Sequence, residues 1–364
     1  MLAIEGSLDT TNILESHSEK SLTVDLGDLL GMKRMINLAL FGAGRIGAVH
    51  AANIAANDST SLKWVVDVFE ASAKKLAESF GAKMSTDPGD ALSDPDVQGI
   101  IVASSTDTHL DLILEGVKAG KAVFCEKPLD LDLARVDDKL DEINGLGVPV
   151  LVGFNRRYDP HFRACYDAIA CGSVGDLEVV KITSRDPGPP PIEYINVSGG
   201  LFRDMMIHDF DLARWLLGEE LVQVFAAASC LVDDEIGAAG DVDTAAVTMK
   251  TASGKLCQID NSRRAIYGYD QRLEVFGSKG MAKADNVQTN TVEIWDGDSV
   301  RREKPPFFFL ERYADAYRAE LDHFVDVIEG KADPAVTPYD GRQVLALADA
   351  ALASSKSGKA ETPT

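Results

Sequence analysis

Short apolar runs alternate with longer amphipathic segments from Ile36 to about Phe154. The apolar runs are nearly continuous, as in strands buried on both faces of a parallel sheet. We expect such strands at Ile36–Phe41, Leu62–Asp67, Val97–Ser104, Lys121–Glu126 and Val148–Phe154. Between them, apolar positions with helical spacing predict helices at 46–57, 70–81, 109–120 and 134–147, three of which end on glycine. This alternation indicates an α/β fold with a doubly wound parallel sheet of the Rossmann type.

The pattern changes after a helix expected near 160–170. Apolar and polar residues then alternate with a period of two, which is typical of a sheet with one buried face. The alternating segments are 177–185, 222–232, 243–251, 254–262, 272–278 and 291–297. A helix carrying Asp204 and His208 lies early among them, and helices near 311–330 and 341–355 end the chain.

These patterns predict three parts. Residues 1–34 form an amino-terminal extension without packed structure, and residues 35–154 form a Rossmann dinucleotide-binding domain. Residues 155–364 form an α+β domain with a large, open-faced, mostly antiparallel sheet. Its carboxyl-terminal helices are expected to pack back on the first domain.

Charge and composition exclude several classes of partner. The 364 residues include 36 Lys and Arg against 58 Asp and Glu, a net charge of −22. Such a surface repels phosphate backbones and anionic lipids, so we expect neither nucleic acid nor membrane partners. No run reaches the ~18–20 apolar residues of a membrane helix, and the first thirty residues do not resemble a secretory signal. Five cysteines without a CxxC pair favour a reducing cytoplasm over a disulfide framework.

The stretch GAGRIG, Gly42–Gly47, follows a predicted strand and opens a predicted helix. In this context its glycines allow a tight turn, a close approach of pyrophosphate, and close packing of helix on sheet. The helix amino end adds free N–H groups for the phosphates. Asp67 ends the second strand, where a carboxylate binds ribose hydroxyls and repels a 2′-phosphate, so the sequence predicts NAD rather than NADP.

Two further features carry candidate chemistry. Ala103–Leu110 and Cys125–Leu129 follow strand ends of the predicted sheet, which aims Lys127 near the nicotinamide. Asp204 and His208 stand four residues apart, on one face of the predicted helix. Such a pair could be a structural hydrogen bond, a metal site or a proton-transfer pair. No second His or Cys lies at ligand spacing, so we expect no metal.

Four motifs occur in a characteristic order: GAGRIG, CEKPL, VGFNRRYDPHF and FRDMMIHDFDLARWLLG. From about Ile36 onward the chain therefore resembles the glucose–fructose oxidoreductase/inositol dehydrogenase/MocA family. The stretches ITSRDPGPPP, SGGLFRDM and NSRRAIYGYDQRLEVFGSKG are most similar to the inositol dehydrogenases within it. The resemblance implies a Rossmann domain joined to an open-faced α/β domain, NAD as cofactor, a cyclic polyol or sugar as substrate, and commonly a homotetramer.

The resemblance also implies residue roles. Lys127 would hydrogen-bond the reacting hydroxyl, and His208 would act as acid and base with Asp204 orienting it. Arg156, Tyr267 and, less directly, Tyr194 would line the substrate pocket. The cofactor contacts expected from the glycine loop and the strand ends are Gly42, Gly44, Arg45, Ile46, Gly47, Asp67, Ser104, Thr106, His109, Glu126 and Lys127.

In the mechanism that follows, His208 removes a hydroxyl proton while Lys127 stabilises the developing charge, and hydride passes to NAD⁺. The reaction expected from the resemblance is oxidation of the C2 hydroxyl of an inositol to a ketone. Three alternatives remain open at the level of the sequence. They are a dehydrogenase for another polyol or pyranose, including scyllo-inositol, a non-catalytic NAD sensor, and a metal-dependent hydrolase built on the Asp–His helix.

Overall fold

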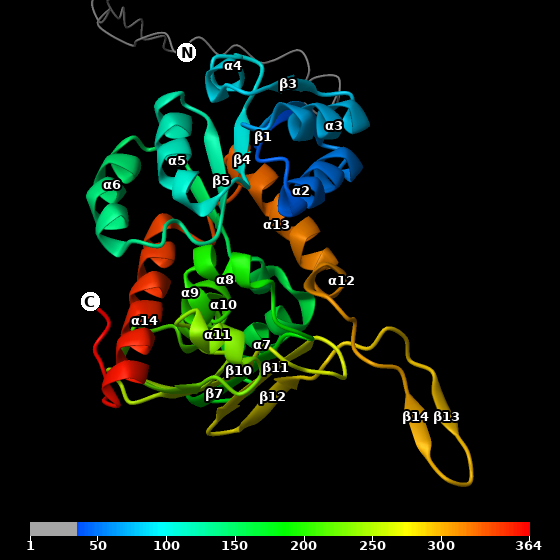
Figure 1. Ribbon diagram of the computed structural model, residues 1–364, viewed down its shortest axis with the longest axis vertical. Coiled ribbons are helices and arrows are strands. Elements are labelled where there is room, and N and C mark those ends of the chain that lie inside the picture. The colour runs from blue at the N-terminus through cyan, green and yellow to red at the C-terminus, as the bar shows by residue number, and fades with distance from the viewer. Residues whose placement is uncertain (1–34) are drawn as a thin grey trace, which may run out of the picture. The chain divides into compact units, whose positions relative to one another are not determined.

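The first sheet holds six parallel strands in the order β3-β2-β1-β4-β5-β6, in a computed structural model that describes residues 35–364 (Figure 1). The expected extension, residues 1–34, lies outside the described residues. The strands are β1 (Ile36–Phe41), β2 (Thr60–Val66), β3 (Lys83–Ser85), β4 (Gly99–Val102), β5 (Ala122–Glu126) and β6 (Val150–Gly153). This order confirms the Rossmann prediction. Only β3 was not predicted, because this three-residue edge strand has no apolar run.

Helices cover both faces of this sheet. They are α2 (Arg45–Ala56), α3 (Glu70–Phe80), α4 (Pro88–Leu92), α5 (His109–Lys118) and α6 (Leu133–Gly145), with a 3-10 turn η1 (Thr106–Thr108). Figure 1 shows α5 and α6 on one side of the sheet and α2 and α3 on the other. The strands of the layer between them are almost wholly buried, which explains why their sequences read as continuous apolar runs.

The second sheet has the order β12-β11-β7-β10-β9-β8, and β7 with β10 is its one parallel pair. Its strands are β7 (Leu177–Arg185), β8 (Leu221–Ser229), β9 (Thr244–Thr251), β10 (Leu256–Ser262), β11 (Asp270–Gly277) and β12 (Gly280–Ala284). Figure 1 shows helices over one face and none over the other. The alternation in β9 follows this arrangement, since Ala245, Val247 and Met249 are buried while the residues between them are exposed. The predicted mostly antiparallel, open-faced sheet is confirmed.

The helices of this part are α7 (Pro160–Ala170), α8 (Ile192–Ser198), α9 (Gly200–Asp204), α10 (Ile207–Leu217), α11 (Asp234–Ala238), α12 (Phe309–Arg312), α13 (Ala314–Ile328) and α14 (Pro338–Ser357), with a 3-10 turn η2 (Asn155–Tyr158). Helix α13 packs against α2 and β5, and α14 packs against α6 and β6. Both therefore connect the second part of the chain to the first sheet. Among residues 35–364, no helix is long and apolar enough to cross a membrane.

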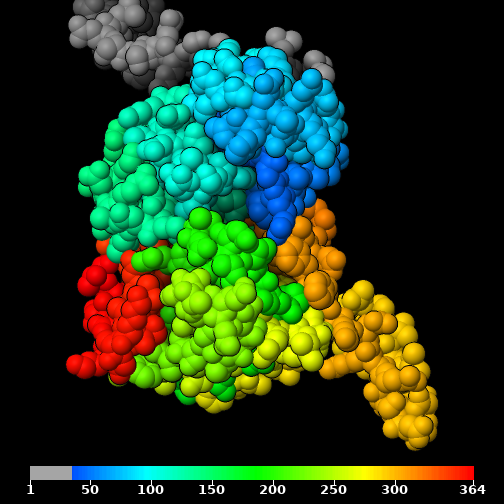
Figure 2. Space-filling model, viewed as in Figure 1, coloured from blue at the N-terminus to red at the C-terminus, as the bar shows by residue number. Residues whose placement is uncertain are grey.

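The segment 291–297 does not join the second sheet, as its alternating pattern had suggested. Instead β13 (Glu293–Trp295) pairs with β14 (Val300–Arg302) in a separate two-stranded hairpin. Figure 2 shows this hairpin standing apart from the sheet. Every residue of the two strands is exposed, including Trp295 at 73%. An alternating pattern identifies a strand but does not say which strand it pairs with.

The helix expected to carry both Asp204 and His208 is interrupted. Helix α9 ends at Asp204, Met205 and Met206 form a turn, and α10 begins at Ile207. Both methionines are buried, so the turn is packed into the core. The two candidate side chains therefore belong to different helices, and the simple i, i+4 geometry does not apply to them.

Candidate active site

The glycine loop connects β1 to α2 and is shaped by two close approaches. Gly42 has a φ of 106°, and a Cβ added there would lie 2.4 Å from the Ala103 carbonyl oxygen. A Cβ on Gly47 would lie 2.0 Å from the carbonyl oxygen of Gly42. At Gly44, in contrast, no atom of residues 35–364 lies within 4 Å of the added Cβ, and no side chain among them caps the helix that follows. The loop is thus closed against the protein and open above Gly44, as a dinucleotide phosphate requires.

Asp67 follows β2 and braces this loop. Its Oδ2 accepts a hydrogen bond from the Ala43 backbone N–H at 2.6 Å, and its Oδ1 accepts one from Phe69 N–H at 2.8 Å. Arg45 and Ile46 begin α2, with Arg45 exposed and its guanidinium 5.7 Å from the centre of the Phe308 ring. The predicted cofactor residues of the loop therefore lie together at the carboxyl ends of the neighbouring strands β1 and β2.

The end of β4 supplies the next group. The Oγ of Ser104 is 2.7 Å from Thr108 Oγ1, and Thr106 lies half-buried in the turn η1. His109, one of the expected cofactor contacts, is 2% exposed, and its ring lies between two backbone carbonyls. Its Nδ1 donates to the Pro128 carbonyl at 2.7 Å, and its Nε2 is 3.2 Å from the Ser104 carbonyl. Burial lowers its pKa. His109 ties the ends of β4 and β5 together.

Glu126 and Lys127 stand at the end of β5. The Oε1 of Glu126 is 2.7 Å from His50 Nε2, so the carboxylate faces α2. Lys127 points the other way, and its ammonium donates to the Asp204 backbone carbonyl at 2.9 Å. Its Nζ is 3.7 Å from the Asp204 carboxylate. Lys127 thus connects the first sheet to the turn that separates α9 from α10.

Asp204 is the acceptor for three neighbours. Its Oδ1 accepts from the Tyr194 hydroxyl at 2.9 Å, its Oδ2 is 3.4 Å from an Arg263 nitrogen, and Lys127 supplies a second positive charge. Burial and the charge of Asp204 raise the pKa of Tyr194. No hydrogen bond joins Asp204 to His208 among the described residues, which corrects the predicted Asp–His pair. The helix break at Met205 and Met206 is the physical reason.

His208 is the second residue of α10 and is half-buried. Its ring packs edge-on against Phe154, with ring centres 5.9 Å apart, and its buried Nδ1 has no hydrogen-bond partner among residues 35–364. Burial lowers its pKa well below the ordinary value, and the positive charges of Lys127 and Arg156 add to that effect. The imidazole is therefore neutral at physiological pH and able to accept a proton.

Arg156 lies beneath the site rather than in it. Its side chain is 3% exposed and pairs with Asp209, while its NH2 donates to Ser184 at 3.2 Å. Asn261 also donates to Asp209, at 2.8 Å. The resemblance implied that Arg156 lines the substrate pocket, whereas in the structure its guanidinium is buried and bonded to Asp209 and Ser184. Its guanidinium anchors α10 next to His208 and contributes positive charge there.

Tyr267 lies in the loop after β10 and is 40% exposed. Its hydroxyl donates to Asp270 at 2.6 Å and accepts from Arg185 at 3.3 Å. Within the described part of the chain, no hydrogen bond or ion pair links it to Lys127 or Asp204. The structure thus does not bring Tyr267 together with the other candidates.

Sequence reasoning missed Asp186 and Arg263. These residues directly follow β7 and β10, whose parallel pairing places both strand ends at one edge. Arg263 is 1% exposed, and its guanidinium is 3.9 Å from Asp186 and 3.4 Å from Asp204. Burial and the nearby Asp204 charge raise the pKa of Asp186 to about 6, against the opposing effect of Arg263. The pair extends the candidate site with a second carboxyl group.

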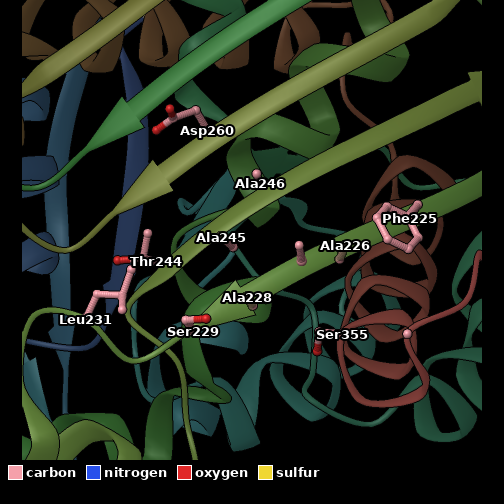
Figure 3. Close-up of a pocket in the computed structure, with 12 residues that line it drawn as sticks. Phe225, Ala226, Ala228, Ser229, Leu231, Thr244, Ala245, Ala246, Asp260 and Ser355 are labelled. Carbon is pink, nitrogen blue, oxygen red and sulfur yellow. The ribbon is translucent and has the colours of Figure 1, made fainter.

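A separate cavity of about 470 Å³ lies on the outer face of β8 and β9, as Figure 3 shows. Alanines, Phe225 and Thr244 line it, with Asp260 and Ser355 at its margin. It contains none of the candidate catalytic residues, so it is not the site of the chemistry. Among residues 35–364, no group of three His, Cys, Asp or Glu side chains could hold a metal ion.

Two family profiles match the chain. Residues 36–154 match the oxidoreductase family with an NAD-binding Rossmann fold, and residues 162–283 match the GFO/IDH/MocA C-terminal domain. Together the matches cover the first sheet, the second sheet, and all the candidate catalytic residues.

Two curated relatives are similar over most of their length. The chain is 48% identical to a myo-inositol 2-dehydrogenase of Thermotoga maritima over 317 residues, which is 87% of this chain and 95% of the relative. It is 49% identical to an inositol 2-dehydrogenase of Rhizobium meliloti over 320 residues, 88% of this chain and 96% of the relative.

Solved structures agree with the fold. A myo-inositol dehydrogenase of Corynebacterium glutamicum is 44% identical with a TM-score of 0.87, covering 91% of this chain and 99% of that one. A scyllo-inositol dehydrogenase of Lactobacillus casei with bound NAD(H) and scyllo-inositol is 28% identical with a TM-score of 0.84, covering 90% and 99%.

Proposed function

Because the chain belongs to the GFO/IDH/MocA family of NAD-binding oxidoreductases, we propose that it oxidises the C2 hydroxyl of myo-inositol to the ketone. The products are 2-keto-myo-inositol and NADH. The names of two relatives at 48–49% identity support this substrate.

The observation that most directly supports the proposal is the contact between Lys127, which directly follows β5, and the end of α9, just before the turn that precedes His208. Lys127 donates to the Asp204 carbonyl at 2.9 Å, and its charge acts on His208. An ammonium donor and a neutral imidazole thus lie together, next to the open end of the Rossmann sheet. Oxidation of an alcohol needs a proton acceptor and a group that stabilises negative charge on oxygen, and these two side chains supply both.

NAD⁺ supplies the hydride acceptor when bound, and the residues present fit it. The open space above Gly44, the uncapped start of α2 and the carboxylate of Asp67 suit a pyrophosphate and a ribose without a 2′-phosphate. The carboxylate oxygens of Asp67 accept from the N–H groups of Ala43 and Phe69, and with NAD bound the carboxylate would also accept hydrogen bonds from the ribose hydroxyls.

The protein's own groups then divide the proton chemistry. Lys127 orients the reacting hydroxyl and stabilises the charge that develops on its oxygen. An imidazole nitrogen of His208 takes the hydroxyl proton, which the lowered pKa of the ring allows at neutral pH. Asp204 positions Lys127 and Tyr194 rather than the imidazole. Acid–base assistance of this kind typically contributes about 10²–10⁴-fold to the rate.

The nearest alternative is another cyclic polyol, with scyllo-inositol first. A Bacillus subtilis relative at 34% identity is a scyllo-inositol 2-dehydrogenase (NAD(+)), and epimers of inositol differ only in the direction of one hydroxyl. The carboxyl groups of Asp186 and Asp204 and the guanidinium of Arg263 are the polar groups that would distinguish them.

The test is reduction of NAD⁺, followed by NADH absorbance, with myo-inositol, scyllo-inositol and glucose as substrates. We expect turnover with myo-inositol, loss of that turnover in His208→Ala, and a ketone at C2 in the product by NMR. The same assay with NADP⁺ checks the cofactor. Absence of NAD⁺ reduction with every cyclic polyol would contradict the proposal and favour a non-catalytic sensor.

We also propose that the protein is a cytoplasmic homotetramer. The open face of the second sheet exposes Phe225, Leu256 and Phe276, which a partner copy would cover. All five cysteines are free thiols, which suits a reducing compartment. Light scattering coupled to gel filtration measures the mass directly, and a monomer of 39.1 kDa would contradict the oligomer.

A further inference from the structure

A buried group of polar side chains behind Lys127 has no place in the reaction described so far. It lies where α13 packs against α2, β5 and η2. Its acidic members are Glu126 at the end of β5 and Glu320 in the middle of α13. Its other titratable members are His50 on α2, Tyr317 on α13 and Tyr158 in η2.

Glu320 is the unusual member of this group. Its side chain has no exposed surface, and neither carboxyl oxygen has a hydrogen-bond partner among the described residues. The charges that act on it are those of Glu126 and Asp211, both negative. An ionised carboxylate in that place would be buried, unpaired and repelled, which proteins avoid by keeping the group protonated.

Glu126 differs from Glu320 in having a partner. Its Oε1 lies 2.7 Å from His50 Nε2, and its side chain keeps 12% of its surface exposed. The ring centre of Tyr317 is 6.0 Å from that of His50, and the charges of both acids act on its hydroxyl. Tyr158 has a buried hydroxyl with no hydrogen-bond partner in the described part of the chain, and Glu320 acts on it as well. Two acids that interact strongly lose their protons in two separate steps, so over an interval of pH the pair carries one negative charge. That charge is more stable on the acid that has a hydrogen-bond partner.

We propose that Glu320 is a positioning residue held as a neutral carboxylic acid, so that the one negative charge of the acidic pair stays on Glu126. On Glu126 the charge binds the ring of His50 and holds the end of β5 in place, next to Lys127. When Glu320 loses its proton to solvent at high pH, its carboxylate repels Glu126 and weakens this arrangement. The buried acid thus sets an upper pH limit for the dehydrogenase.

The thermodynamic consequence has a definite sign. Burial and the charge of Glu126 raise the pKa of Glu320 well above its ordinary value of 4.5. Between pH 4.5 and that raised pKa, the folded protein then binds one more proton than the unfolded chain. The stability that protonated Glu320 provides is complete below about pH 4.5 and is lost as the pH rises toward the raised pKa.

The test compares Glu320→Gln with Asp326→Asn, which removes an exposed carboxylate from the same helix. Glutamine keeps the shape and cannot ionise, so the Tm of E320Q relative to wild type should increase as the pH rises from about 4.5 to 8. The Tm difference between D326N and wild type should not change over the same pH range. An infrared difference spectrum should show the carbonyl band of a protonated carboxyl in wild type at neutral pH and not in E320Q.

Glu126→Gln provides a second variant should E320Q fail to fold. Removing the neighbouring charge should lower the pKa of Glu320, so the protonated-carboxyl band should disappear at a lower pH than in wild type. A flat Tm difference for E320Q, or a neutral-pH spectrum without the band, would overturn the proposal. Neither measurement depends on catalysis.

A kinetic measurement tests the pH limit and rests on the inositol dehydrogenase activity proposed above. The alkaline limb of kcat should move upward by about one pH unit in E320Q and should not move in D326N. An alkaline limb that coincides with that of wild type would overturn the link to Lys127, even with Glu320 neutral. Absence of activity in wild type would contradict the proposed function and leave the unfolding test intact.

Discussion

The ammonium group of Lys127 donates a hydrogen bond to the backbone carbonyl of Asp204 across 2.9 Å. Lys127 directly follows strand β5 of the first sheet, and Asp204 ends helix α9 of the second part of the chain. The bond therefore joins the cofactor side to the substrate side through a carbonyl that the end of α9 leaves free.

Replacement of Lys127 by Ala should lower kcat by about 10²–10⁴-fold, because the developing oxygen charge loses its ammonium donor. Binding of NAD should change little, since the glycine loop and Asp67 are untouched. Steady-state kinetics give the first quantity and calorimetric titration with NAD⁺ gives the second. Lys121→Ala is a matched control, because that lysine bonds only to backbone carbonyls of Asp94 and Val97. A kcat within threefold of wild type would remove Lys127 from the chemistry.

His208 should titrate well below pH 6.5, since burial and the charges of Lys127 and Arg156 favour its neutral form. The proton-accepting form is then lost only as the pH falls through that lowered pKa, so the acid limb of kcat/KM should lie below pH 6.5. Lys127→Met removes one of the two cations and should raise the pKa of His208. NMR titration of labelled histidine in both proteins measures this change, and an unchanged or lower value would contradict the assignment.

Tyr194→Phe and Asp204→Asn should differ in severity. The phenylalanine removes one hydroxyl from Asp204 Oδ1, whereas asparagine removes the charge that faces both Lys127 and Arg263. We expect a fall in kcat/KM of about tenfold for Y194F and about 10³-fold for D204N. The prediction is wrong if the two variants are equally impaired.

Gly44→Ala and Gly47→Ala form a matched pair on one loop. A methyl group at Gly44 meets no protein atom, so the Tm of the free protein should stay close to that of wild type. The same methyl occupies the space open to a pyrophosphate, so KM for NAD should rise at least about tenfold. At Gly47 the methyl would collide with the Gly42 carbonyl and should destabilise the fold by about 1–3 kcal/mol. Thermal unfolding with and without NAD distinguishes the two effects, and a G44A protein with normal KM would place the phosphates elsewhere.

The first sheet could be predicted almost completely, because a strand buried on both faces leaves a continuous apolar run and GAGRIG marks the turn after the first one. The site was harder, since its geometry depends on contacts between distant segments. Lys127 was predicted by its strand end, whereas Asp186 and Arg263 depend on the parallel pairing of β7 with β10, which period-two patterns do not specify.

Two differences between the expected and the observed site, at Asp204 and His208 and at Arg156, have the same cause. The spacing of Asp204 and His208 fits one helix turn, but buried Met205 and Met206 form a turn between them. The resemblance implied a place for Arg156 in the substrate pocket, whereas the structure pairs its buried guanidinium with Asp209 inside the core. Tertiary packing decided both outcomes, and a linear pattern does not record it.

The turn at Met205 and Met206 separates residues with two different proposed roles within one short stretch. His208 is fixed to the core through its neighbours Asp209 and Asp211, which pair with buried arginines. On the proposed function, the hydroxyl of Tyr194 and the carboxyl groups of Asp186 and Asp204, which would contact the substrate, all lie before the turn. Substitutions before the turn could therefore change substrate recognition, while His208, the proposed proton acceptor after the turn, keeps its position.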